Sequence, residues 1–225
     1  MNALRSNFEK EIAMLNNDLI VMASLIEESI AKSMVVIRTG DGSLADEIIL
    51  RDKEINSMEK TIESRCLTLL LRQQPVASDL RLISTALGMI TDMERIGDHA
   101  KDISEIVKYS AQRQIASLST HIPQMAAKAI DMVKDSITAF VEKDVQKARE
   151  TIGKDDEIDR LFDIVKEELT GIMRENVSDI EECLNTFMIT KYLERIGDHA
   201  VNICEWVIYL VTGVHTDTDD DARTG

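Results

Sequence analysis

The chain of 225 residues has few of the residues that interrupt helices and few of those that build aromatic cores. It contains two prolines, Pro75 and Pro123, and aromatic residues make up 4% of it, although 44% of the residues are hydrophobic. Its core must therefore consist of Leu, Ile, Val, Met and Ala. Because proline is the residue that helix interiors tolerate least, its scarcity favours long helices over sheets.

Cysteines are also few, and they lack the spacing of metal or redox sites. Cys66, Cys183 and Cys204 lie far apart, and no Cys-x-x-Cys occurs. We expect them to be reduced and buried, as in a cytoplasmic protein. The first ten residues carry no apolar signal region, and no apolar run approaches the ~20 residues of a membrane span. The sequence thus predicts a cytoplasmic protein.

Basic charge is in short supply. The chain has 26 Lys and Arg against 41 Asp and Glu, which gives a net charge of −15. Nucleic acids and anionic lipids are poor partners for such a chain, since their binding relies on basic side chains. Cations and basic protein surfaces are better ones, although much of the negative charge serves solubility alone.

Apolar residues recur at alternating intervals of three and four, which predicts helices that pack along one face. Glycines at positions 40 and 42, Pro75 and a polar stretch at 112–120 mark breaks between them. Ser43 is the expected N-cap of the second helix, and Ser178 with Glu181 has capping-box spacing. We predict six helices, over residues 4–39, 43–74, 78–112, 120–143, 144–174 and 178–213.

The chain repeats itself. The sequence Glu-Arg-Ile-Gly-Asp-His-Ala occurs at 94–100 and again at 194–200, and the segments 51–56 and 154–159 also align position by position. Such self-similarity indicates two copies of one unit. We predict an all-α fold in which six long helices form two tandem, homologous three-helix bundles, over 1–115 and 116–213. An acidic, disordered tail would follow at 214–225.

Each copy carries acidic residues at helical spacing. Glu94 and Asp98 are four residues apart, as are Glu194 and Asp198, so each pair stacks on one helix face. With the oxygen side chains of the middle helix, each bundle would offer four or five oxygen ligands. Such ligands suit hard or intermediate cations such as Mg²⁺, Mn²⁺, iron or Ca²⁺. The candidate metal ligands are Asp52, Asn56, Glu94, Asp98, Asp102, Asp155, Asp159, Glu194, Asp198 and Asn202.

The alternative is a solvent-exposed acidic face whose charges pair with Arg95, Lys101 and Arg195. His99 and His199 point about 100° around the helix from the neighbouring aspartates. We expect them to pack beside a helix crossing, with ligation at the edge of a metal site as the second possibility. The Glu-x-x-His spacing of di-iron bundles is missing.

Gly97 and Gly197 lie inside predicted helices, where glycine costs roughly 1 kcal/mol relative to alanine. Their repetition indicates a close helix approach or an unobstructed metal face, unless it reflects common ancestry alone. No Ser-His-Asp series, Walker loop or Cys-His zinc pattern is apparent.

The chain resembles the PhoU family of phosphate-signalling proteins over about residues 4–213. The resemblance rests on the two heptapeptides, on Asp-x-Glu-Ile-Asn/Asp in both middle helices, and on the ending Tyr-Leu-Val-Thr-Gly at 209–213. The family's Glu/Asp-x-x-x-Asp motif matches Glu94/Asp98, Glu194/Asp198 and Asp155/Asp159. It matches 52–56 only in part, because Asn56 replaces a carboxylate, so fuller metal occupancy is expected in the second repeat.

The resemblance implies function without catalysis. PhoU proteins are cytoplasmic, associate with a high-affinity phosphate ABC transporter through its ATPase subunit, act with a sensor histidine kinase, and restrain the phosphate-starvation response. Homodimers and bound Fe, Mn or Mg are further expectations from the resemblance, with no cofactor beyond metal. Two alternatives are a metal-dependent phosphohydrolase and an accessory protein of a low-affinity phosphate permease.

Overall fold

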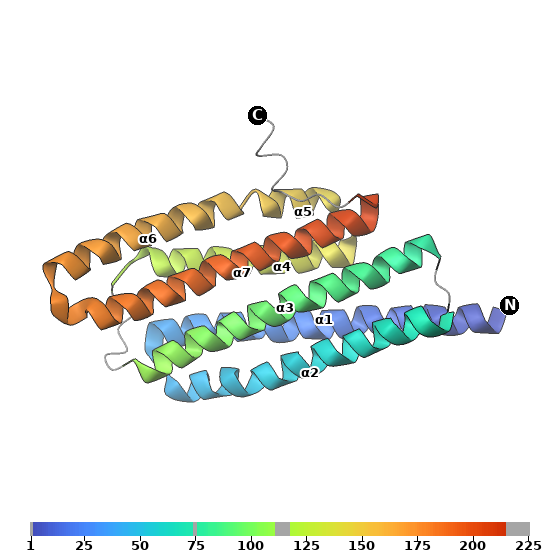
Figure 1. The fold of residues 1–225 in the computed structure, drawn as a ribbon, viewed down its shortest axis with the longest axis horizontal. Coiled ribbons are helices and arrows are strands. Elements are labelled where there is room, and N and C mark those ends of the chain that lie inside the picture. The colour runs from blue at the N-terminus through green and yellow to red at the C-terminus, as the bar shows by residue number, and fades with distance from the viewer. Residues whose placement is uncertain (1, 74–75, 111–117, 215–225) are drawn as a thin grey trace.

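The computed structural model describes residues 2–73, 76–110 and 118–214, and almost all of them are helical (Figure 1). The predicted tail therefore lies outside the described residues from position 215 onward. The elements are α1 (Asn2–Thr39), α2 (Gly42–Gln73), α3 (Ala77–Tyr109), α4 (His121–Glu142), α5 (Val145–Ile152), α6 (Asp155–Glu175), a 3₁₀ turn (Val177–Asp179) and α7 (Ile180–Thr212).

The all-helical prediction is confirmed, and five of the six expected helices match within a few residues. The predicted fifth helix is instead divided into α5 and α6. Gly153 and Lys154 form a turn between them, in which Lys154 N–H donates to the carbonyl of Thr151 at 3.0 Å. As a result Asp155 is the first residue of α6 rather than an interior helical residue.

Both predicted serine caps are wrong. The carboxylate of Asp41 accepts hydrogen bonds from the backbone N–H groups of Ser43 and Leu44 at 2.9 and 3.1 Å, so Asp41 caps α2. The Ser178 hydroxyl donates to Asn176 Oδ1 at 2.8 Å within the 3₁₀ turn, and α7 begins two residues later. An aspartate or asparagine just upstream satisfies the free backbone donors in place of the expected serine.

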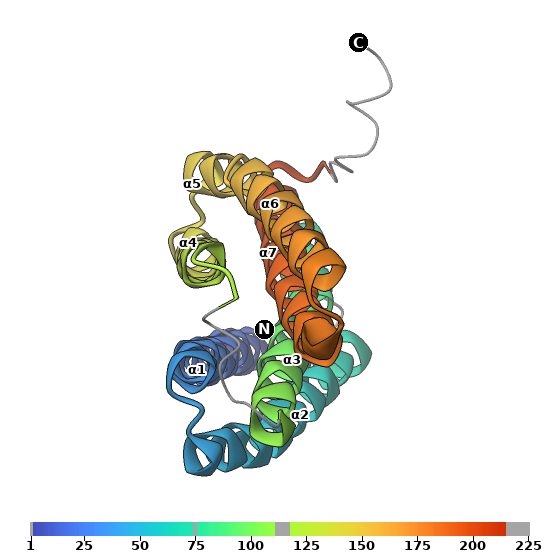
Figure 2. The ribbon, with the colours of Figure 1, turned by 90° about the vertical axis from the view of Figure 1, so that its left-hand side faces the viewer.

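The helices form two groups that meet along α3 and α7. Viewed end-on, α1, α2 and α3 make one group and α4, α5, α6 and α7 the other (Figure 2). Helices α3 and α7 lie side by side at the centre and run in opposite directions (Figure 1). The last helix of each repeat therefore forms the junction between the repeats.

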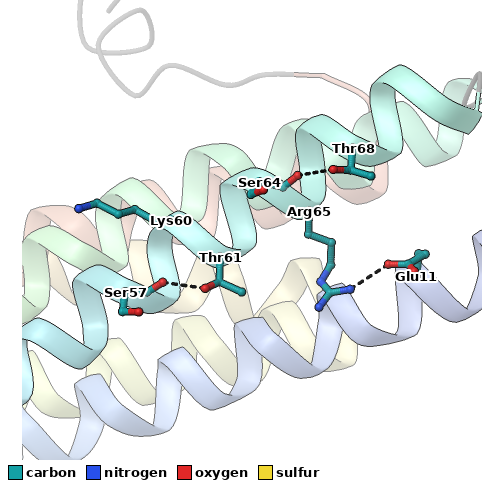
Figure 3. A pocket seen from close by; sticks show the side chains of 7 residues that line it. All are labelled: Glu11, Ser57, Lys60, Thr61, Ser64, Arg65 and Thr68. Atoms are coloured by element: carbon teal, nitrogen blue, oxygen red, sulfur yellow. Dashed lines mark hydrogen bonds and ion pairs between the residues drawn. The ribbon is translucent and has the colours of Figure 1, made fainter.

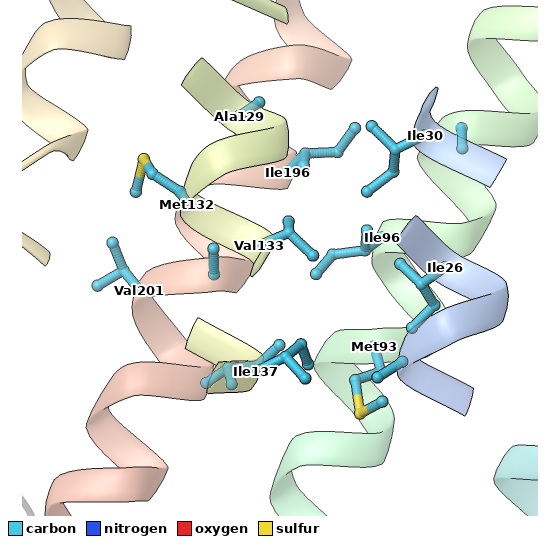
Figure 4. Close-up of a cluster of buried hydrophobic side chains, with 14 of the residues drawn as sticks. Ile26, Ile30, Met93, Ile96, Ala129, Met132, Val133, Ile137, Ile196 and Val201 are labelled. Atoms are coloured by element: carbon cyan, nitrogen blue, oxygen red, sulfur yellow. The ribbon is translucent and has the colours of Figure 1, made fainter. Parts of the chain in front are cut away.

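One hydrophobic core spans the two groups. Side chains from α1, α3, α4 and α7 interdigitate at the junction (Figure 4). Ile26, Met93, Ile96 and Ile196 are all fully buried there. The repeats thus share a core, which aliphatic and methionine side chains fill as the composition predicts.

The three cysteines are free thiols with buried side chains, as expected. Burial raises the pKa of Cys66 and of Cys204 to about 12, so neither thiol ionises at neutral pH. None of the helices in the described part of the chain has the length and apolar character that a membrane span requires.

Candidate functional site

The repeated heptapeptide lies where α3 and α7 pack on each other. Ile96 and Ile196 are its core residues and approach one another at the junction (Figure 4). His99 and His199 follow on the flank of the same junction, with ring centroids 5.5 Å apart. One short motif therefore supplies core, junction and acidic side chains from successive positions, because a helix turns 100° per residue.

Both heptapeptide glycines mark a close approach of the middle helix. A Cβ at Gly97 would lie 2.9 Å from Cδ1 of Ile55. A Cβ at Gly197 would lie 2.9 Å from Asp155 Oδ1 and 3.0 Å from Cδ1 of Ile158. The close approach is confirmed, and at Gly197 it brings a carboxylate oxygen against the bare helix backbone.

The first acidic cluster consists of Asp52 and Asn56 from α2 with Glu94 and Asp98 from α3. The Asp52 side chain is only 7% exposed, and its Oδ1 atom has no hydrogen-bond partner. Its Oδ2 atom accepts from the Asn56 amide at 3.2 Å and lies 3.5 Å from Lys101 Nζ. Burial raises the pKa of Asp52, and the negative charge of Asp98 adds to the rise against the pull of Lys101.

The α3 side of this cluster is paired with basic residues. Arg95 lies 3.6 Å from Glu94 and 3.4 Å from Asp98, and Lys101 Nζ lies 3.9 Å from Asp98 Oδ1. Burial, with Asp98 as the next cause, raises the pKa of Glu94. The alternative prediction, that Arg95 and Lys101 pair with these carboxylates, is therefore confirmed. Burial of the carboxylates nevertheless distinguishes this cluster from a solvent-exposed acidic face.

The second acidic cluster consists of Asp155 and Asp159 from α6 with Glu194 and Asp198 from α7. Burial raises the pKa of Asp155 to about 7, and the charges of Asp159, Asp198 and Glu194 add to the rise. Asp155 Oδ1 and Glu194 Oε2 are buried and have no hydrogen-bond partner. Asp159 and Asp198 also have raised pKa values, with burial as the main cause.

Two basic residues also approach this second cluster, but they pair only with its α7 carboxylates. Lys191 Nζ lies 2.5 Å from Glu194 Oε1, whereas Arg195 stays 3.7 Å from Asp198 and 4.0 Å from Glu194. Among the residues that the structure describes, no ion pair reaches Asp155. The second cluster thus holds one more carboxylate than the first and leaves Asp155 without a counter-ion.

Two predicted ligands face the other repeat. The amide of Asn202 donates to Asp92 Oδ1 at 2.9 Å, across the α3–α7 junction. Burial raises the pKa of Asp102, and a hydrogen bond with Tyr192 of α7 opposes the rise. The structure therefore groups eight of the ten candidate residues into two clusters and places Asp102 and Asn202 at the junction between them.

The histidines belong to the same junction, as the sequence predicts. His199 Nδ1 lies 2.9 Å from Asp92 Oδ1, and His99 stacks on Tyr192 with ring centroids 5.3 Å apart. Burial, with His199 as the next cause, lowers the pKa of His99 to about 4. A neutral His99 ring therefore packs between the repeats at physiological pH.

The two clusters match a hard cation in donor type but are not assembled around one. Four of their buried oxygens have no hydrogen-bond partner: Asp52 Oδ1, Asn56 Oδ1, Asp155 Oδ1 and Glu194 Oε2. Yet over 2–73, 76–110 and 118–214 no three His, Cys, Asp or Glu side chains converge as a ready metal site. A cation would have to draw the carboxylates together.

A separate groove of about 520 Å³ lies between α1 and α2 (Figure 3). Arg65 crosses it to reach Glu11 at 2.8 Å and Asp18 at 2.9 Å. Its other lining residues are Ser57, Lys60, Thr61, Ser64 and Thr68. The groove shares no residue with either acidic cluster.

Sequence reasoning missed four residues of these sites. The negative charge of Glu59 contributes to the raised pKa of Glu94. Glu59 lies seven residues after Asp52, a spacing that places both on one face of α2. Lys191 stands three residues before Glu194, which is also a same-face spacing. Asp92 and Tyr192 carry no local signal, since their role appears only when α3 and α7 are juxtaposed.

Comparison with known proteins assigns the chain to a family. Residues 19–107 and 122–207 each match the PhoU domain. A phosphate-specific transport system accessory protein PhoU homolog of Clostridium acetobutylicum is 38% identical over 96% of this chain and 99% of its own length. The Escherichia coli K12 protein of that system is 29% identical, over 93% of this chain and 87% of its own.

Two solved structures of PhoU proteins have the same fold as this chain. The crystal structure of PhoU from Pseudomonas aeruginosa superposes with a TM-score of 0.86 at 32% identity, over 92% of this chain and all of that one. The crystal structure of the phosphate transport system regulatory protein PhoU from Streptococcus pneumoniae superposes with a TM-score of 0.87 at 30% identity. The match covers 93% of this chain and 99% of that one. These relatives are accessory and regulatory proteins of a non-enzymatic family. With its two matching domains, this chain belongs to the PhoU family.

Proposed function

We propose that this protein restrains the phosphate-starvation response as an adaptor between a high-affinity phosphate ABC transporter and a sensor histidine kinase, and that it modulates phosphate uptake. It acts in the cytoplasm as a homodimer and reaches the membrane only through its partners. The observation that carries the proposal is the match of almost the full chain to accessory proteins of the phosphate-specific transport system. Its acidic surface suits basic loops on partner proteins.

A reporter strain tests the regulatory half of the proposal. The strain lacks its own PhoU protein and carries a phosphate-starvation promoter fused to a reporter gene. We expect the promoter to be active at high phosphate and to be silenced when this chain is supplied. Continued promoter activity, with the chain present at normal levels by immunoblot, would contradict the proposal.

Binding measurements test the adaptor half. We expect the purified chain to bind both the transporter's ATPase subunit and the cytoplasmic part of the kinase in biolayer interferometry, and light scattering to give the mass of a dimer. An ATPase subunit from an unrelated ABC transporter serves as the control. Equal binding to that control, or to neither partner, would remove the adaptor role.

We further propose that the two acidic clusters bind Fe, Mn or Mg ions, with fuller occupancy in the second. Support comes from the carboxylate chemistry and from the buried oxygens that lack a hydrogen-bond partner. Mutual repulsion raises the pKa values of Asp155, Asp159 and Asp198 beyond the effect of burial, and a cation would relieve this repulsion. The bound ion would fix α2 on α3 and α6 on α7.

Elemental analysis tests this second proposal on protein purified without chelator or His tag. The test variant carries Glu94→Gln, Asp98→Asn, Glu194→Gln and Asp198→Asn. A matched control loses four exposed carboxylates outside the clusters, at Glu54, Glu142, Glu167 and Glu181. We expect metal in the wild type and the control and none in the test variant, with unchanged circular dichroism. Absence of metal from all three, even after incubation with each ion, would refute cation binding.

A further inference from the structure

Each acidic cluster contains the ammonium group of a lysine, and the two lysines occupy different positions of the repeat. Lys101 follows Asp98 by three residues, whereas Lys191 precedes Glu194 by three. The repeat counterparts of these lysines are Val201 and Thr91. Shared ancestry therefore does not explain why each cluster has one ammonium group, and the clusters themselves provide a physical reason.

Lys101 bridges the two helices of the first cluster. Its Nζ atom lies 3.5 Å from Asp52 Oδ2 on α2 and 3.9 Å from Asp98 Oδ1 on α3. The ammonium group therefore forms ion pairs with carboxylates of both helices. Its charge thus lies between the carboxylates that would have to meet around a metal ion.

Lys191 of α7 contributes the ammonium group of the second cluster, where it forms an ion pair on its own helix. Its Nζ atom is 2.5 Å from Glu194 Oε1 and lies over the ring of Phe162 on α6, 5.2 Å from the centroid. Its charge also opposes the rise in the pKa values of Asp159 and Asp198. One ammonium group therefore acts on three of the four carboxylates.

We propose that Lys101 and Lys191 are built-in counter-cations that occupy the acidic clusters of the metal-free protein and must move away before a metal ion binds. The inference rests on the proposed cation binding and adds a competing ligand to it. Buried Asp52 and Asp155 oxygens that lack a hydrogen-bond partner show that each ammonium satisfies its cluster incompletely. Both lysine side chains are about a third exposed, at 29% and 34%, so each has a path into solvent.

The exchange would set the metal affinity. A divalent ion binds only after displacing a charge that already neutralises part of the cluster, so removal of the lysine charge strengthens binding by about tenfold or more. It would also explain why the described carboxylates do not converge without metal. Asp52, Asp98 and Glu194 are instead paired with an ammonium group.

Titration of the full-length, chelator-treated protein with Mn²⁺, followed by calorimetry and by electron paramagnetic resonance of free Mn²⁺, tests the inference. The variants are Lys101→Met and Lys191→Met, with Lys101→Arg and Lys191→Arg retaining the charge. Lys108→Met is the matched control, because Lys108 also lies on α3 but pairs with Asp46, outside the clusters, at 2.5 Å. Circular dichroism verifies folding, and Lys→Gln replaces any Met variant that does not fold.

We expect the Met variants to bind Mn²⁺ about tenfold more tightly than the wild type, with the Arg variants and the Lys108 control unchanged. Mn²⁺ binding only in the Met variants would support the inference still more strongly. Wild-type binding that the Met variants leave unchanged or weaken would overturn the inference while the proposed cation sites stand. No binding in any variant would overturn both.

Discussion

The two repeats carry the same heptapeptide, but different charged residues surround it. In the first acidic cluster Asn56 replaces a carboxylate, and Lys101 joins the buried Asp52 to the neighbouring helix. In the second, Asp159 stands in place of the asparagine, and the half-buried Asp155 has its pKa raised to about 7. Identical heptapeptides therefore face different electrostatic environments. Asn56 or Asp159 of the middle helix and the different positions of Lys101 and Lys191 on α3 and α7 cause the difference.

The two acidic clusters differ in how far their charges are already neutralised by protein residues. The first cluster is closer to a structural ion-pair network, in which most charges have protein partners. The second keeps unrelieved repulsion, and a site that is unfavourable when empty has the most to gain from a ligand. We therefore expect the second repeat to respond more strongly to cations.

The largest expected effect on stability comes from position 88 in the α3–α7 junction. A Cβ at Gly88 would lie 2.1 Å from the Trp206 ring, so the indole must move in Gly88→Ala. We expect a loss of about 2 kcal/mol in the free energy of unfolding, because overpacking outweighs the better helix propensity of alanine. Urea denaturation measures the loss.

The matched substitution in the other repeat is Met188→Ala. Met188 is 41% exposed, so its replacement should change stability by less than about 0.5 kcal/mol. Equal losses in the two variants would mean that the junction is symmetric at these positions, contrary to the packing of Trp206 on Gly88.

The next largest effect on stability distinguishes Asp155 of the second cluster from Asp52 of the first. Because the folded-state pKa of Asp155 is raised to about 7 from 3.8, folding favours its protonated form, and its contribution lowers stability as pH rises from about 4 to 7. Asp155→Asn should therefore stabilise the metal-free protein at pH 8 by about 1–2 kcal/mol. Thermal unfolding in chelator across this pH range measures the gain.

Asp52→Asn is the companion variant in the first repeat. The substitution removes the ion pair with Lys101 as well as the cost of burying the carboxylate. We therefore expect a smaller gain, or a net loss, in the free energy of unfolding at pH 8. If Asp52→Asn stabilised the protein more than Asp155→Asn, the assigned difference between the clusters would be reversed.

A third prediction concerns acid stability at the junction. The pKa of His99 is lowered to about 4 from 6.5, so the unfolded chain takes up a proton first as pH falls. Stability is therefore lost between pH 6.5 and 4, and His99→Gln should reduce that loss by about 1 kcal/mol. Chemical denaturation at pH 7, 5.5 and 4.5 measures it, and an unchanged slope with pH would contradict the burial of a neutral His99.

The smallest stability effect is expected at the heptapeptide glycines. Gly97→Ala and Gly197→Ala should each lower the free energy of unfolding by up to about 1 kcal/mol, since the steric cost of the contacts at 2.9 Å outweighs the gain in helix propensity. Their effects on cation binding should differ, because only the Cβ at position 197 meets a cluster oxygen. We expect Gly197→Ala to weaken Mn²⁺ binding and Gly97→Ala to leave it nearly unchanged, as measured by calorimetry.

Much of the fold could be predicted from the sequence because helix periodicity and the repeat are strong local signals. The break between α5 and α6 was missed, since Gly153 within an amphipathic pattern does not show whether a helix bends or ends. The serine caps were wrong for a similar reason: Asp41 and Asn176, each two residues upstream of the predicted serine, compete for the same backbone donors.

The candidate site was predictable within each repeat but not between the repeats. Spacing alone grouped Glu94 with Asp98 and Glu194 with Asp198. It also extended the rows to Asp102 and Asn202, which the α3–α7 crossing turns toward Tyr192 and Asp92. A helix crossing is a tertiary feature, and no sequence interval encodes it.

The central claim, that the second cluster is the stronger cation site, is tested most directly by Mn²⁺ titration of two double variants. Glu94→Gln/Asp98→Asn alters only the first cluster, and Glu194→Gln/Asp198→Asn only the second. We predict that the second-cluster variant loses the tightest binding step while the first-cluster variant retains it. Equal losses, or loss of the tightest step from the first-cluster variant alone, would contradict the claim.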